Sequence, residues 1–285
     1  MPRPEHQAPP EIFYNESEAK KYTRNTRIIE IQTSMSERAI ELLALPDDGQ
    51  PKYLLDLGCG SGLSGEVLEE NGHYWIGVDI SSAMLDVCRE RECETGDTIQ
   101  MDLGQGVPFR AGTFDGAISI SALQWLCNVD KRGQKPGKRL SKLFSSLYAC
   151  LSRGAKAVFQ FYPENSDQVE LITKTAMKAG FYGGLVIDFP NSSKAKKVFL
   201  VLFTGGAPQT MPKALGTGDD EDVDRHVPST IDYDSKRERI RNARNAKVPI
   251  KSRQWIMDKK ERYRRQGKDV RDNSKYTGRR RSGRF

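Results

Sequence analysis

Three glycines at alternate positions, Gly58, Gly60 and Gly62, follow a short apolar run that contains Asp56. Glycines at the end of a strand allow a sharp turn into a helix, because no Cβ atoms obstruct the backbone. Bare peptide groups at a helix N-terminus can then contact a nucleotide-like ligand. A second apolar run ends at Asp79, where doubly wound folds place the acid that binds ribose hydroxyls. The spacing therefore predicts a site for a cofactor that contains a nucleoside.

The spacing of the glycines also favours one class of cofactor. Nicotinamide dinucleotides are bound by G-x-G-x-x-G, whereas this chain reads G-x-G-x-G. Asp56, just before the glycines, suits a positively charged ligand better than a pyrophosphate. S-adenosylmethionine is therefore the favoured cofactor. The alternatives are a nicotinamide site and a strand, turn and helix that bind no ligand.

Alternating strands and helices must position these residues. Apolar runs predict a strand that begins at Tyr53, further strands at 75–79, 98–102, 113–120 and 155–161, and an antiparallel pair at 184–189 and 197–203. Helical spacing predicts helices at 22–45, at 64–71, after a cap at 81–82, at 137–151 and at 166–179. This order predicts an α/β fold with a doubly wound, seven-stranded, mostly parallel sheet.

The loops after the third, fourth and fifth predicted strands carry further candidates. In an open α/β sheet, ligands bind beyond the carboxyl ends of the strands. Asp102 ends the third strand and is expected to bind the adenine amino group, with a simple turn aspartate as the alternative. Gln124 and Trp125 follow the fourth strand, and Tyr162 and Asn165 follow the fifth. We expect these four residues to position the reacting group, although a tryptophan is more often a core residue.

Four segments are expected along the chain: a helical lid at 1–52, a cofactor-binding domain at 53–203, an acidic linker at 204–235 and a basic tail at 236–285. Tyr14 and Tyr22 are candidates for covering the cofactor, and the alternative is that they only pack on the sheet. Mean hydropathy is −0.63, which indicates that part of the chain is solvated.

The net charge of +7 is unevenly distributed. The tail holds twenty Lys or Arg against five Asp or Glu, a net of +15, so the remaining residues sum to −8. Trp255, Tyr263 and Tyr276 interleave with these charges, a pattern typical of segments that stack on RNA bases. The alternatives are a solvated helix or a nuclear-import signal.

Five cysteines occur without a C-x-x-C pair, and the chain has only three histidines. This composition predicts reduced thiols in an intracellular protein and no metal site within the chain. The start of the sequence lacks the apolar region of a signal peptide, and the apolar runs are too short to span a membrane.

Residues 53–203, roughly, resemble the class I S-adenosylmethionine-dependent methyltransferases. More narrowly the chain resembles the eukaryotic enzymes that methylate guanine N7 of small-subunit (18S) ribosomal RNA. That closer likeness lies in the sequences at 10–14, 124–126 and 255–265. The expected cofactor-binding residues are Asp56, Gly58, Gly60, Gly62, Asp79, Ile80, Asp102, Leu103 and Ser119.

The resemblance implies methylation of guanine N7 during maturation of the pre-40S particle in the nucleus, with the cytoplasm as a second location. It also implies a heterodimer with a small zinc-binding activator subunit. The loop at 121–124 has neither the Asp/Asn-Pro-Pro-aromatic motif of amino-directed enzymes nor the Pro-Cys nucleophile of pyrimidine enzymes. Two rival functions remain: a non-catalytic ribosome assembly scaffold, and a methyltransferase acting on a protein or small molecule.

Overall fold

The computed structural model describes residues 3–91, 93–130, 133–192, 195–205 and 210–216, and in the tail 253, 256–257, 260, 264, 271–274 and 277. The chain divides into two units, Met1–Asp219 and Asp220–Phe285. Most of the expected acidic linker, and the tail aromatics Trp255, Tyr263 and Tyr276, lie outside the described residues. Among the residues described, every helix is too short or too polar to cross a lipid bilayer.

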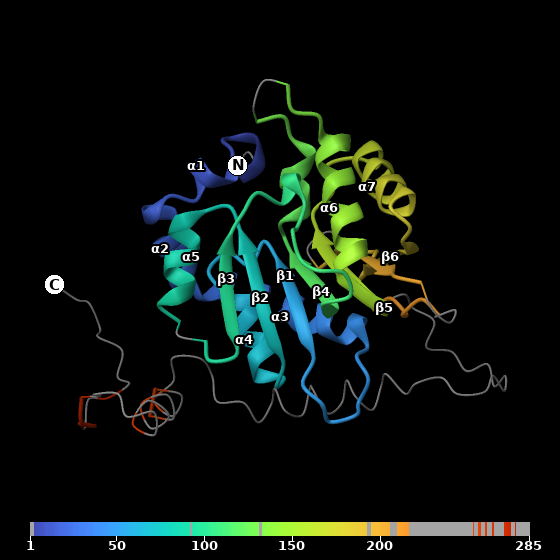
Figure 1. Ribbon diagram of the computed structural model, residues 1–285. Coiled ribbons are helices and arrows are strands. Elements are labelled where there is room, and N and C mark those ends of the chain that lie inside the picture. Colours follow the sequence, from blue (N-terminus) through green and yellow to red (C-terminus); the bar gives the residue numbers. More distant parts are fainter. Residues whose placement is uncertain are drawn as a thin grey trace. The chain divides into compact units, whose positions relative to one another are not determined.

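A seven-stranded sheet forms the centre of the first unit, in the order β3-β2-β1-β4-β5-β7-β6 (Figure 1). Strands β3, β2, β1, β4 and β5 pair in parallel, and β7 pairs antiparallel with both β5 and β6. The strands are β1 (Tyr53–Leu57), β2 (Tyr74–Asp79), β3 (Gly96–Gln100), β4 (Phe114–Ile120), β5 (Leu151–Phe161), β6 (Tyr182–Asp188) and β7 (Lys197–Phe203). The predicted fold class is therefore confirmed.

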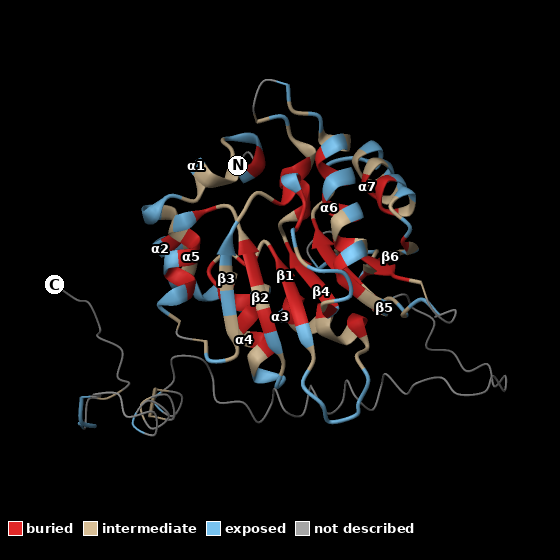
Figure 2. Ribbon diagram, viewed as in Figure 1, coloured by how far each residue is buried: buried red, intermediate tan, exposed pale blue. Residues whose placement is uncertain are grey.

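Helices cover both faces of the sheet, which is why the central strands are buried along almost their whole length (Figure 2). On one face, α6 (Pro136–Cys150) and α7 (Ser166–Lys178) pack over a core that includes Phe144 and Phe159, with ring centroids 5.6 Å apart. On the other, α3 (Thr26–Leu43), α4 (Leu63–Glu70) and α5 (Ser82–Arg89) enclose a second core around Trp75.

The N-terminal segment consists of η1 (Pro4–His6), α1 (Pro10–Phe13), α2 (Glu16–Arg24) and α3. The single helix predicted at 22–45 is therefore wrong: two helices meet at Asn25. Asn25 adopts an extended backbone, and its Oδ1 accepts hydrogen bonds from the N–H groups of Arg27 and Ile28, which caps α3. The apolar periodicity continued across the break, so spacing alone did not reveal it.

Candidate functional site: a cofactor pocket at the carboxyl ends of the strands

The glycine turn leaves β1 at Gly58 and enters α4 after Gly62. Gly58 and Gly60 have φ values of +78° and +52°, a region that side chains rarely adopt. A Cβ added to Gly58 would lie 2.3 Å from Cβ of Ala122, in the loop after β4. Only glycine fits here, and the bare backbone of the turn forms one wall of a pocket.

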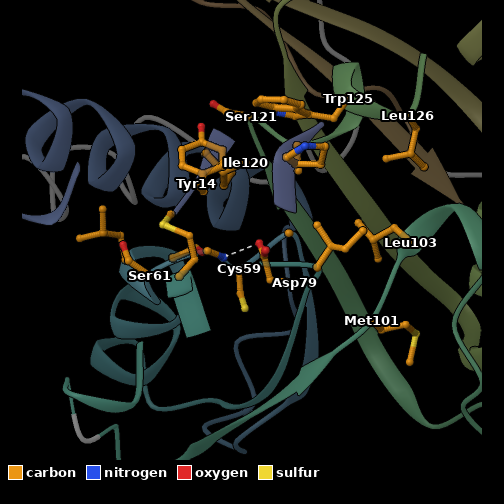
Figure 3. Close-up of a pocket in the computed structure, with 18 of the residues that line it drawn as sticks. Tyr14, Cys59, Ser61, Asp79, Met101, Leu103, Ile120, Ser121, Trp125 and Leu126 are labelled. Atoms are coloured by element: carbon orange, nitrogen blue, oxygen red, sulfur yellow. Dashed lines mark hydrogen bonds between the residues drawn. The ribbon is translucent and has the colours of Figure 1, made fainter. Parts of the chain in front are cut away.

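Asp79, at the tip of β2, ties the glycine turn to α5. Its Oδ2 accepts a hydrogen bond from the Gly60 N–H at 2.9 Å, drawn as a dashed line in Figure 3, and its Oδ1 accepts from the Ser81 N–H at 2.8 Å. Burial raises the pKa of Asp79, while these backbone hydrogen bonds oppose that rise. Asp79 and Ile80 both line the pocket, as expected for residues at the second strand tip.

Asp56 lies behind the pocket wall. It is fully buried, and its Oδ2 accepts a hydrogen bond of 2.6 Å from the Ser64 hydroxyl. Oδ1 has no hydrogen-bond partner within the described part of the chain. Burial raises the pKa of Asp56 to about 7. Ser119 is also buried and donates to the Leu57 carbonyl at 2.7 Å, while Gly62 is the N-cap residue of α4; neither is among the lining residues.

The third strand tip carries a paired carboxylate. Asp102 Oδ1 accepts a hydrogen bond from the Gly104 N–H at 2.8 Å and from Arg139 Nη2 at 3.0 Å. Asp102, Leu103 and Arg139 all line the pocket. Arg139 comes from α6, far along the chain, and no sequence signal distinguished it from a solvated helix residue.

Aromatic rings line the pocket opposite the glycine turn. Figure 3 shows Tyr14 and Trp125 on the side away from Cys59 and Asp79. The ring centroid of Tyr14 is 5.7 Å from that of Trp125 and 6.0 Å from that of Tyr22. Burial raises the pKa of Tyr14 and of Tyr22 well above the usual value, so both phenols stay neutral. Tyr14, Tyr22 and Trp125 thus form an aromatic wall of the same pocket that the glycine turn and the strand tips line.

Side-chain hydrogen bonds to three loops hold the N-terminal segment beside this pocket. The Ser81 hydroxyl donates to the Tyr14 carbonyl at 2.8 Å, Asn128 Nδ2 donates to the Glu5 carbonyl at 2.8 Å, and Arg3 Nη1 donates to the Tyr162 carbonyl at 3.0 Å. These bonds come from three different loops, after β2, η3 and β5. Pro10, Tyr14 and Tyr22 of this segment line the pocket, so these bonds hold part of the pocket wall in place.

Three positioning candidates lie outside the pocket wall. Gln124 is buried, and its Nε2 donates to the Ser121 carbonyl at 2.8 Å. The Tyr162 hydroxyl lies 3.2 Å from Lys197 Nζ, and Asn165 caps α7 by accepting from the Gln168 N–H. Trp125 is both buried and in the wall. Sequence reasoning missed Gln32 and Arg139, which line the pocket from helices whose inward faces only the packing reveals.

The described residues contain no group of three or more His, Cys, Asp or Glu that could hold a metal ion. The pocket instead fits a nucleoside-containing cofactor. The glycine cradle admits no Cβ at Gly58, carboxylates stand at two neighbouring strand tips, and buried Asp56 Oδ1 and Ser61 Oγ lack partners in the region described.

Comparison with known proteins agrees with this geometry. The model described as "Methyltransferase domain" matches residues 55–159, and the one described as "Methyltransferase involved in Williams-Beuren syndrome" matches residues 202–283. A solved phosphoethanolamine N-methyltransferase 2 of Haemonchus contortus, bound to S-adenosylhomocysteine, superposes with a TM-score of 0.53 at 17% identity. The superposition covers 68% of this chain and 58% of that chain, and it shows that the two share a fold. The fold and pocket define a class I S-adenosylmethionine-dependent methyltransferase, with S-adenosylmethionine as its cofactor.

Relatives identify the family within that class. The chain is 58% identical to the mouse "18S rRNA (guanine-N(7))-methyltransferase" over 99% of this chain and 98% of that protein. It is 48% identical to the Saccharomyces cerevisiae "18S rRNA (guanine(1575)-N(7))-methyltransferase", with full coverage of both. The chain belongs to the family of 18S rRNA (guanine-N(7))-methyltransferases.

Proposed function

We propose that this enzyme methylates guanine N7 in 18S ribosomal RNA. The observation that carries the proposal is that relatives named for this reaction match from end to end, at 47–58% identity, including the region of the basic tail. Maturation of the pre-40S particle in the nucleus, with the cytoplasm as a second location, is the setting proposed for the reaction.

Each part of the cofactor has a proposed contact. Gly58 and Gly60 approach the methionine part, Asp79 accepts from the ribose hydroxyls, and Asp102 and Leu103 bind the adenine. Asp56 and Ser119 do not contact the cofactor directly and instead support the pocket wall. Asp56 accepts a hydrogen bond from Ser64 next to the glycine turn, and Ser119 donates one to the Leu57 carbonyl of β1. When bound, S-adenosylmethionine supplies an electrophilic methyl group.

The reaction requires positioning of the acceptor more than acid–base catalysis. Guanine N7 has a lone pair in the ring plane and carries no proton, so no side chain has to act as a general base. Trp125 and the neutral Tyr14 offer ring faces on which a base can stack. Gln124 acts indirectly, because it holds the carbonyl of Ser121, a wall residue with a φ of +59°.

Primer extension after borohydride reduction and aniline cleavage, or mass spectrometry, of 18S ribosomal RNA tests the proposal directly. Cells that lack this chain should lose one N7-methylguanosine, and the wild-type chain should restore it. A Gly58→Glu variant should not, because the added side chain occupies the turn. Unchanged methylation in cells without the chain refutes the proposed reaction.

A ribosome assembly role beside catalysis is also proposed. It makes a different prediction for the same variant: Gly58→Glu restores 40S subunit levels while methylation stays absent. If 40S levels fall as far with this variant as with deletion of the chain, the assembly role is refuted.

We also propose a small zinc-binding activator as the partner of a heterodimer. Its docking site is the β3 edge of the sheet, where one side of the strand pairs with β2 and the other has no neighbouring strand within the described residues. Ile99 on this strand is 37% exposed, an apolar group on an open edge that a partner strand can cover.

Co-purification tests the partner. Ile99→Asp should reduce recovery of the activator with the tagged chain by at least about tenfold, a large effect for one exposed apolar contact. Tyr74→Asp changes an exposed aromatic of a strand away from the edge and serves as the control. Equal recovery for wild type and Ile99→Asp excludes this docking surface.

The basic tail is the proposed RNA-binding and nuclear-targeting segment. Removal of 236–285 should reduce affinity for ribosomal RNA and make the remaining binding less sensitive to salt, because about fifteen net positive charges are lost. Affinity retained without the tail, measured by filter binding at two salt concentrations, assigns RNA binding to the body of the enzyme.

A further inference from the structure

Arg139 is a buried arginine in the pocket wall that neither the fold nor the proposed chemistry accounts for. It lies in α6, is 8% exposed and has its guanidinium between two carboxylates. Nη2 lies 3.0 Å from Asp102 Oδ1, and Nη1 lies 3.5 Å from Asp130 Oδ2. Nε and Nη1 have no hydrogen-bond partner in the described part of the chain. A buried cation whose N–H donors lack partners costs folding free energy, so its retention in the pocket wall calls for an explanation.

The structure makes room for this guanidinium. A Cβ added to Gly104 would lie 2.3 Å from Arg139 Nε, so a larger residue there would displace the arginine. The same Gly104 donates its N–H to Asp102 Oδ1. One short turn, η2 (Leu103–Gln105), therefore both seats the guanidinium and contacts the carboxylate that it pairs with.

Gly104 and Arg139 together fix the orientation of the Asp102 carboxylate. Both hydrogen bonds to its carboxylate, from Gly104 N–H and Arg139 Nη2, go to Oδ1. Oδ2 has no such bond within the described region, so it is the oxygen available to a ligand. A carboxylate oxygen accepts hydrogen bonds and donates none, so Oδ2 presents an acceptor to that ligand.

We propose that Arg139 is a positioning residue that makes the pocket selective for a 6-aminopurine. Held by Arg139, the Asp102 carboxylate presents a fixed acceptor to the purine edge. An exocyclic amino group donates to it, whereas a 6-oxo group places two acceptors against each other. Without the hydrogen bond from Arg139 the carboxylate can rotate, and the penalty on a 6-oxopurine falls. The inference rests on the proposed placement of adenine at Asp102.

Calorimetry with two ligands tests the inference on the full-length chain. The probes are S-adenosylhomocysteine and S-inosylhomocysteine, which differ at purine position 6. Wild type should bind the adenosyl ligand about thirtyfold or more tightly, the effect of one mispaired hydrogen bond to a charged group. In Arg139→Met this ratio should fall below about fivefold. Arg139→Lys should give an intermediate ratio, because it keeps the charge and loses the fork.

Two more variants separate selectivity from stability. Gly104→Ala keeps the arginine and displaces its guanidinium, so it should lower the ratio as Arg139→Met does; it also serves if Arg139→Met fails to fold. Lys138→Met changes an exposed neighbour on the same helix and should leave the ratio unchanged.

Three outcomes overturn the inference, and they are distinguishable. If the variants weaken both ligands equally and keep the wild-type ratio, Arg139 has only a structural role. If Lys138→Met lowers the ratio as much, the effect is not specific to the guanidinium. If wild type itself binds both ligands alike, adenine does not lie at Asp102. None of these results bears on guanine methylation, which the mapping of 18S ribosomal RNA tests separately.

Discussion

Gly58→Ala perturbs the turn at the position where the structure allows the least space. The added Cβ would lie 2.3 Å from Cβ of Ala122, whereas unstrained carbon atoms are separated by about 3.8 Å, so the two segments must part by about 1.5 Å. Overpacking of this kind costs about 1–3 kcal/mol. The φ of +78° adds about 1–2 kcal/mol for a residue with a side chain. Together these terms predict a loss of about 2–5 kcal/mol of stability.

Two matched variants separate the two contributions. Gly72→Ala has almost the same φ, +79°, with no atom within 4 Å of the added Cβ, so it should cost only the backbone term of about 1–2 kcal/mol. Gly58→Ala combined with Ala122→Gly removes the clash and keeps the backbone strain. It should therefore be about as stable as Gly72→Ala. Urea unfolding of the three variants measures these differences.

Ligand affinity should follow the clash and not the backbone strain. Ala122 lines the pocket, so its displacement should weaken S-adenosylhomocysteine binding by at least about tenfold, or 1.4 kcal/mol. The double variant should recover most of this affinity, and Gly72→Ala should bind as wild type does. The reasoning is refuted if Gly58→Ala binds within twofold of wild type, or if Ala122→Gly brings no recovery.

Three further predictions concern the buried charges and the lid. Burial raises the pKa of Asp56 to about 7 and also raises that of Asp79, so the folded chain holds these protons more tightly than the unfolded chain. Stability should therefore fall as the pH rises from about 4 to 7, and Asp56→Asn should flatten part of that fall in a series of thermal melts. Arg38 pairs through Nε and Nη2 with Asp188, whose side chain is 3% exposed. Arg38→Met should therefore lower the free energy of unfolding, measured in urea, by about 3–5 kcal/mol, and a loss below about 1 kcal/mol contradicts a buried pair. Arg3→Ala removes two hydrogen bonds from the N-terminal segment to backbone carbonyls after β5. S-adenosylhomocysteine should then dissociate several-fold faster, as measured by stopped flow, and an unchanged dissociation rate argues against a lid held at this point.

Local sequence determined the turn and the order of the strands. Glycines at alternate positions and an acid at the next strand tip are typical of a nucleoside site, and this pattern predicted that Gly58, Gly60 and Asp79 would lie together. The apolar runs gave the strands because a buried parallel strand needs an uninterrupted apolar sequence. The charge of the tail is likewise a property of composition alone.

Tertiary packing decided which side chains face the pocket. Asp56 and Asp79 both belong to acid-bearing strands, yet the carboxylate of one is sealed behind the wall and that of the other lines it. Arg139 reaches the site only because α6 packs over η2. These outcomes depend on contacts between residues far apart in sequence, which no local pattern contains.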